Sequence, residues 1–173
     1  VVAWVPLVNV FSTNAMFIIP KKKYKKISFN KIPFKYQDAS EIIKSDYFRL
    51  YILNKYGGLW SDFDIMYINN IEEYYNKKGL TKERNVILYR YFWKECNRNV
   101  YPVGLFLCNR NNSVFSVILK NIEIFYNKTQ YQCLGCQMFH FLFNSKEGKK
   151  IICQMKLPEL NMDDADCYLP IKW

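Results

Sequence analysis

Four charged side chains in one short stretch have the types and spacing of a site for a metal ion and a phosphate. Asp46 and Arg49 stand three residues apart on a predicted helix, so they share one helix face. Asp62 and Asp64 flank Phe63 in an extended segment, where residues two apart point to the same side. Two carboxylates this close raise each other's pKa unless a cation lies between them. Mg²⁺ or Mn²⁺ suits such carboxylates, and phosphate oxygens complete its coordination.

The elements that must position these side chains are predicted from the same stretch. Residues 39–56 form a helix, because their apolar side chains recur at helical spacing and Asp38 opens a capping-box-like pattern. Ser45 is an alternative cap, for a second helical piece. Gly57–Gly58 end the helix, and Leu59–Trp60 form a buried strand that leads to the two aspartates. Helix, turn and strand are thus expected to hold all four charged groups at one cleft.

Each part of this pattern has a simpler interpretation. A lone D-x-D is usually a solvated loop, and an aspartate three residues before an arginine is usually a surface ion pair. The combination is more specific than its parts, since S-D-x-x-R, two glycines and aromatic-x-D-x-D follow one another in order. The combination therefore favours a binding site.

The stretch SDYFRLYILNKYGGLWSDFD, from Ser45 to Asp64, resembles the core of the DXD-containing nucleotide-sugar glycosyltransferases with the GT-A fold. It is most similar to the group that holds the large clostridial glucosylating toxins, yeast mannosyltransferases and the α-1,4-glycosyltransferases. The resemblance implies an α/β fold, a compact Rossmann-like mixed sheet flanked by helices. We expect one such domain over residues 1–173, shortened in the base-binding part before Ser45.

The resemblance also implies roles for the charged residues. Ser45 would lie against the nucleoside, and Asp46 and Arg49 would hold the hydroxyls of the donor sugar and its phosphate side. Asp62 would contact ribose and sugar, and Asp64 would ligate the metal directly, with Asp62 as the second member of the metal pair.

Three tryptophans are further candidates for donor binding. Trp60 stands where the family usually has a tyrosine near the donor. Trp4 lies on the expected first strand, where relatives place an aromatic side chain on the base, although a core position is an equal alternative. The C-terminal segment Tyr168–Trp173 resembles the closing aromatic-x-Pro-x-x-Trp segment of the group, so Trp173 would reach the leaving phosphate or act as a packing plug.

The activity implied is a retaining transfer of a hexose from a nucleotide-diphospho-sugar, expected to be a UDP-sugar, with Mn²⁺ or Mg²⁺. The acceptor would be an unidentified glycan or protein. Two departures from the family pattern, Ser61 before the first aspartate and the missing asparagine near Gly104, leave an alternative open. In that alternative the chain is a non-catalytic relative that binds a nucleotide sugar or a glycan.

Composition limits the other classes of function. The formal charge of +10 suggests nucleic acid or an anionic membrane surface as a partner. Lysines cluster only at residues 21–26, however, so we attribute the charge to coding bias and expect no nucleic acid. There is no transmembrane run of about twenty apolar residues and no recognisable signal peptide. Together with six cysteines, this favours a reducing, cytoplasmic location. Cys133 and Cys136 form a lone C-x-x-C, for which buried thiols are favoured over a zinc or redox site.

The rest of the chain is predicted as alternating short elements. His140, the sole histidine, is expected to be a satisfied structural residue rather than a base. The aspartates at positions 163, 164 and 166 are expected in a solvated turn, although a further metal or donor contact is the alternative. The predicted elements are strands at 86–92, 104–108 and 151–153, a polar loop at 96–102, and helices from Asn112 or Ser113 to Tyr126 and from Leu134 to Phe143.

Overall fold

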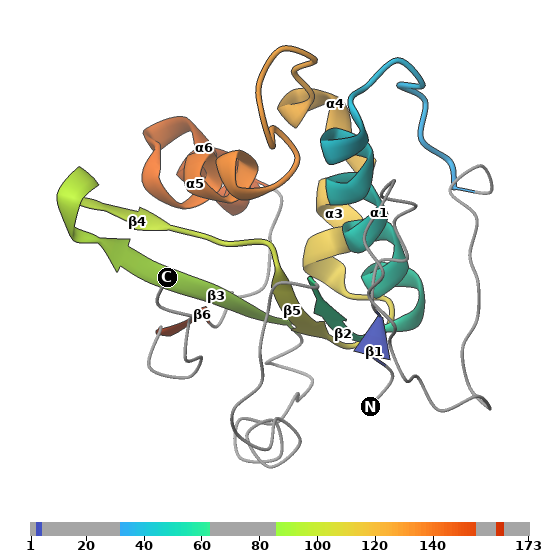
Figure 1. The fold of residues 1–173 in the computed structure, drawn as a ribbon, viewed down its shortest axis with the longest axis horizontal. Coiled ribbons are helices and arrows are strands. Elements are labelled where there is room, and N and C mark those ends of the chain that lie inside the picture. The colour runs from blue at the N-terminus through green and yellow to red at the C-terminus, as the bar shows by residue number, and fades with distance from the viewer. Residues whose placement is uncertain (1–2, 5–31, 63–85, 155–161, 165–173) are drawn as a thin grey trace, which may run out of the picture.

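The computed structural model describes residues 3–4, 32–62, 86–154 and 162–164, and these form an α/β arrangement of helices on a mixed sheet (Figure 1). The strands are β1 (Ala3–Trp4), β2 (Gly58–Ser61), β3 (Val86–Trp93), β4 (Arg98–Val100), β5 (Leu105–Cys108) and β6 (Met162–Asp164). The helices are α1 (Glu41–Tyr56), α3 (Ser113–Lys120), α4 (Ile122–Phe125), α5 (Cys136–Asn144) and α6 (Lys146–Gln154), with a 3₁₀ turn, η2 (Lys94–Cys96).

The described strands form one sheet in the order β1-β2-β5-β3-β4, and β6 pairs with β3 outside this order. β1 runs parallel to β2 with Trp4 opposite Trp60, and β2 runs antiparallel to β5. β3 is antiparallel to β5 and β4 and parallel to β6. The prediction of a mixed α/β sheet is confirmed, while its assignment to the GT-A fold stays a prediction.

Helix α1 begins and ends where its sequence signals lie. The Ser40 hydroxyl accepts a hydrogen bond from the Ile43 N–H at 3.4 Å, so Ser40 is the N-cap rather than Asp38. Ser45 lies inside the helix, and the alternative of a second helical piece is wrong. Gly57 ends the helix at φ 69°, and a Cβ there would lie 2.6 Å from the Arg110 backbone nitrogen. Only glycine fits this left-handed turn, which aims the chain directly into β2.

The hydrophobic core lies between α1, α3 and α5 and the central strands. All four residues of β5 are buried, as are three of the four in β2, because both strands lie inside the sheet. Phe106 on β5 packs against Phe115 of α3 and Phe139 of α5, with ring centroids 5.8 and 5.7 Å away. The core therefore ties the strand next to β2 to the helices that surround the candidate site.

Three predicted elements differ in the structure. Residues 151–153, predicted as a strand, lie in helix α6, where the Ser145 hydroxyl accepts from the Gly148 N–H at 2.8 Å and starts the helix. The predicted loop at 96–102 contains β4, since Asn97 adopts a left-handed conformation that closes a hairpin with β3. The helix from Ser113 divides at Asn121, whose side-chain amide donates to the Val117 carbonyl at 2.9 Å.

Other predictions on this part of the chain are confirmed. Asn112 caps α3, its side chain accepting from the Phe115 N–H at 2.9 Å. The His140 ring has partners in the Asn99 carbonyl at 3.3 Å and the Asn144 side chain at 3.2 Å. In contrast, the prediction of a solvated turn is wrong at residues 163 and 164, because they lie in β6 and pair with β3. Asp166 lies outside the described residues. None of the described helices combines the length and apolar character needed to cross a membrane.

Candidate functional site

Helix α1 and the end of β2 bring three of the four predicted charged residues together. Asp46 and Arg49 lie on the buried face of α1, and Asp62 follows the last residue of β2. The Arg49 Nη2 lies 3.2 Å from Asp46 Oδ1, and Nη1 lies 3.4 Å from Asp62 Oδ2. The guanidinium therefore bridges a carboxylate of the helix and a carboxylate of the strand, as the spacing predicts.

Backbone and aromatic contacts hold this bridge in place. The Arg49 Nη1 also donates to the Val103 carbonyl, and the guanidinium carbon lies 5.3 Å from the centroid of the Trp60 ring. A planar guanidinium satisfies several acceptors and an aromatic face at once, which the single ammonium of a lysine cannot do. Arg49 is thus fixed between the sheet and the helix, with 6% of its surface exposed.

Asp62 is oriented by hydrogen bonds and is partly exposed to solvent. Its Oδ1 accepts from the indole Nε1 of Trp60 at 2.8 Å, and its backbone N–H donates to the Gly104 carbonyl at 2.8 Å. Its side chain is 31% exposed, in contrast to Asp46, which is fully buried. A carboxylate oxygen accepts more than one hydrogen bond or metal bond. Asp62 is therefore the described carboxylate of this cluster that a ligand can reach.

Asp46 is buried with incomplete pairing. Neither of its carboxylate oxygens accepts a hydrogen bond among the described residues, although Arg49 lies close as a counter-ion. Burial raises the pKa of Asp46 to about 6; the Arg49 charge opposes this rise and the Asp62 charge adds to it. The negative charge of Asp46 is thus costly in the folded state and depends on Arg49.

Gly135, directly before α5, covers the Asp46 carboxylate. A Cβ at Gly135 would lie 2.4 Å from Asp46 Oδ2, so only glycine allows this approach. The neighbouring cysteines surround the same group: Cys133 is buried, and the Cys136 thiol donates to the Gln132 side chain at 2.8 Å. Burial, and then the Asp46 charge, raises the pKa of Cys136, so this thiol stays protonated. The prediction of a buried thiol is confirmed at Cys133.

The other predicted site residues are placed as follows. Ser45 lies half-buried on α1, one residue before Asp46. Trp60 is 1% exposed and belongs to the core, where it positions Asp62. The backbone of Trp4 pairs with that of Trp60 across β1 and β2. Asp64 and Trp173 lie outside the described residues. Donor contacts of these five residues stay predictions.

Sequence reasoning missed three contributors to this site. The Val103 and Gly104 carbonyls act through the backbone, so their side chains carry no signal. Gly135 lies within the C-x-x-C motif, which drew attention to the thiols rather than to the glycine between them. A glycine directly before an apolar helix was the one available signal.

Comparison with known proteins gives one match. A family model described as "Glycosyltransferase sugar-binding region containing DXD motif" matches residues 9–91, a range that includes α1, β2 and the D-x-D pair. No curated protein and no solved structure matches the chain. The match supports a relation to the DXD-containing glycosyltransferases.

Proposed function

We propose that the protein is a retaining glycosyltransferase that moves a hexose from a nucleotide-diphospho-sugar, a UDP-sugar in the first instance, to an acceptor hydroxyl. The observation that carries the proposal is the Arg49 guanidinium between Asp46 and Asp62, inside the segment that the sugar-binding family model matches. A guanidinium suits the diphosphate, and a partly exposed carboxylate suits sugar hydroxyls or a metal ion.

The described residues fit a divalent metal only in part. Asp62 offers an exposed carboxylate whose orientation Trp60 and Arg49 fix, as outer-shell partners do for metal ligands. No group of three or more metal-ligating side chains occurs within the described residues. Mg²⁺ usually takes one or two protein carboxylates and completes its coordination shell with phosphates and water. Asp64 and Asp62 would hold the metal, which would neutralise charge on the leaving diphosphate.

The chain's own groups then have distinct tasks. Arg49 places a fixed positive charge beside Asp62, where the leaving phosphate gains charge. Asp46 would act on the donor through Arg49, because its own carboxylate is fully buried. Neither described carboxylate is placed as a free nucleophile, since one is buried and the other is held by Trp60 and Arg49. In the front-face transfer that we propose, the acceptor hydroxyl gives its proton to the donor phosphate.

The test is release of free nucleotide from a panel of nucleotide sugars mixed with the protein and Mn²⁺. We expect one donor to be turned over, and Asp64→Asn to lower the rate at least about a hundredfold, as loss of a key electrostatic contact does. Asp38→Asn is the matched control, because Asp38 is exposed and pairs with Lys128 away from this cluster. Full activity of Asp64→Asn would exclude the metal role, and no binding or turnover of any donor would refute the proposal.

One observation favours a second candidate, a relative that binds a nucleotide sugar without transferring it. Asp46 has no exposed surface and lies under Gly135, so the acid beside Arg49 cannot touch a donor in this arrangement. Calorimetry separates the two functions: donor binding with no nucleotide release supports the second, and release supports the first.

A further inference from the structure

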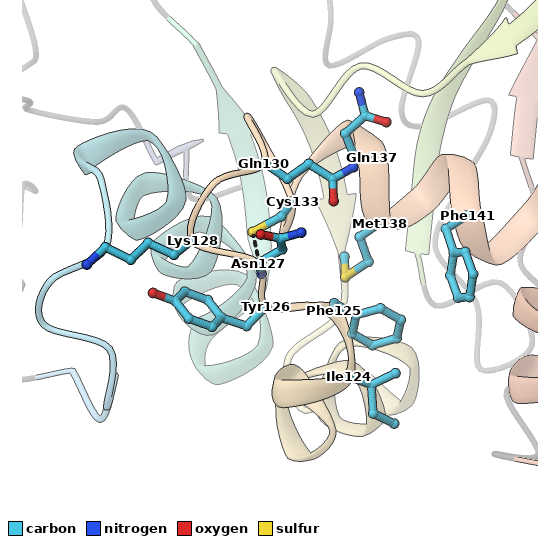
Figure 2. A pocket seen from close by; sticks show the side chains of 10 residues that line it. All are labelled: Ile124, Phe125, Tyr126, Asn127, Lys128, Gln130, Cys133, Gln137, Met138 and Phe141. Atoms are coloured by element: carbon cyan, nitrogen blue, oxygen red, sulfur yellow. Dashed lines mark hydrogen bonds between the residues drawn. The ribbon is translucent and has the colours of Figure 1, made fainter.

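A pocket of about 500 Å³ lies between α4 and α5, on the loop that joins them (Figure 2). Its lining comes from residues 124–141 alone, so a single continuous segment builds it. Its volume falls in the usual range for small-molecule sites, about 300–1,000 Å³. None of the charged residues of the cluster around Arg49 lines it.

The lining combines amide groups with apolar surfaces. In Figure 2 Gln130 and Gln137 lie toward the top of the view, Asn127 lies beside Cys133 near its centre, and Met138 and Phe141 lie to the right. The side-chain amides of Gln130 and Gln137 make no hydrogen bond within the described structure, and each offers two donors and an acceptor. The pocket thus presents unused hydrogen-bonding groups opposite an aromatic ring that is 36% exposed.

The pocket carries almost no charge. No carboxylate lines it, and its single cationic side chain, Lys128, pairs with Asp38 and points away from the other lining residues in Figure 2. Burial raises the pKa of the Cys133 thiol, which therefore stays neutral. A phosphate, a metal ion or a carboxylated ligand would find no counter-charge here, whereas an uncharged polar ligand meets amides of both hydrogen-bonding kinds.

We propose that this pocket binds one uncharged sugar unit of a glycan. Its hydroxyls would bond to the amides of Gln130 and Gln137, and its C–H face would pack on Phe141. A ligand with one polar and one apolar side is what this division of the lining matches.

The pocket and the charged cluster adjoin each other at residues 133–135. Cys133 lines the pocket, and Gly135, two residues later, contacts Asp46. The Asp46 charge is close enough to contribute to the raised pKa of Cys133. The assignment of this sugar to the acceptor glycan rests on the proposed function. The binding of a neutral sugar in the pocket is independent of that function.

The experiment titrates the full chain with maltotriose, cellotriose and mannotriose, without donor or metal, and follows binding by saturation-transfer NMR and calorimetry. We expect at least one to bind at millimolar concentration, and Phe141→Ala and Gln130→Ala each to weaken it about tenfold. Tyr131→Ala is the matched control, because Tyr131 is a 64% exposed aromatic on the same loop outside the lining. Gln130 is exposed, so its replacement tests the pocket even where Phe141→Ala fails to fold.

Absence of binding by all three sugars, or equal losses in Tyr131→Ala and Phe141→Ala, would overturn the pocket assignment. Preference for a glucuronate trisaccharide over the neutral sugars would overturn it as well. Nucleotide release from the donor alone is measured in parallel. Nucleotide release without saccharide binding refutes the pocket assignment and supports the proposed transferase function. Saccharide binding without nucleotide release supports the pocket assignment and counts against the transferase function.

Discussion

The cluster around Arg49 and the pocket between α4 and α5 differ in the charge of their side chains and in how many of their polar groups are already paired. The cluster holds three charged groups, two of them buried, each fixed by partners from α1, β2 or the segment before β5. The pocket holds uncharged amides, two of them without a partner in the described structure, around a partly exposed ring. Pre-organised charge stabilises developing charge without later rearrangement, while unengaged neutral groups leave hydrogen bonds for a ligand.

This difference places stability and recognition in different regions. The Arg49 charge offsets the free-energy cost of burying the Asp46 carboxylate. Single substitutions in the cluster should therefore lower the stability of the protein strongly. The pocket's lining side chains are mostly partly exposed, so changes there should affect binding far more than folding.

The largest expected effect is on stability when the bridge is broken. Arg49→Met leaves Asp46 buried without its counter-ion, and we expect a loss of about 4 kcal/mol in the free energy of unfolding. Urea unfolding followed by circular dichroism measures it. Lys128→Met is the matched control, because it breaks an exposed ion pair and should lower the free energy of unfolding far less than Arg49→Met does. Similar losses in both variants would show that the two regions do not differ in this way.

The second largest expected effect is a difference in the pH dependence of stability between wild type and Asp46→Asn. The pKa of Asp46 is raised from 3.8 to about 6, so the folded state holds an extra proton between these values. Stability from this group is therefore lost as pH rises through about 4 to 6. Asp46→Asn removes the titration, and its stability relative to wild type should rise by about 3 kcal/mol from pH 4 to pH 7.

The control for this pH experiment is the exposed pair of Asp38 and Lys128, outside the cluster around Arg49. Lys128 lowers the pKa of the exposed Asp38, so that pair adds stability as pH rises. Asp38→Asn should therefore shift relative to wild type in the opposite direction from Asp46→Asn. Parallel curves for wild type and Asp46→Asn would contradict the raised pKa.

The smallest of these effects concerns Gly135, which lies against the Asp46 carboxylate. Gly135→Ala would force the Asp46 carboxylate away from its place beside Arg49, at a cost of about 2 kcal/mol. In an Asp46→Ala background the added methyl group has room, so the same change should cost little. A double-mutant cycle from thermal or urea unfolding gives the coupling. Additive losses would mean that Gly135 and Asp46 do not constrain each other.

Much of α1 and its approach to the site could be read from the sequence. The helix, its glycine turn and the buried β2 follow from spacing and composition, and so does the shared face of Asp46 and Arg49. Residues 151–153 show the opposite case: a short apolar run fits a strand or a helix, and packing of Ile151 and Ile152 against the core coincides with helix.

The sequence by itself determined which residues stand side by side along the helix and at the end of the strand, because those relations depend only on local backbone geometry. The tertiary structure decided their environment. Gly135 and Val103 reach Asp46 and Arg49 from distant parts of the chain, so burial, the raised pKa and the remaining exposure of Asp62 are invisible to local spacing. The pocket is likewise invisible to local spacing, because its lining residues come together only when α4 and α5 are folded against the core.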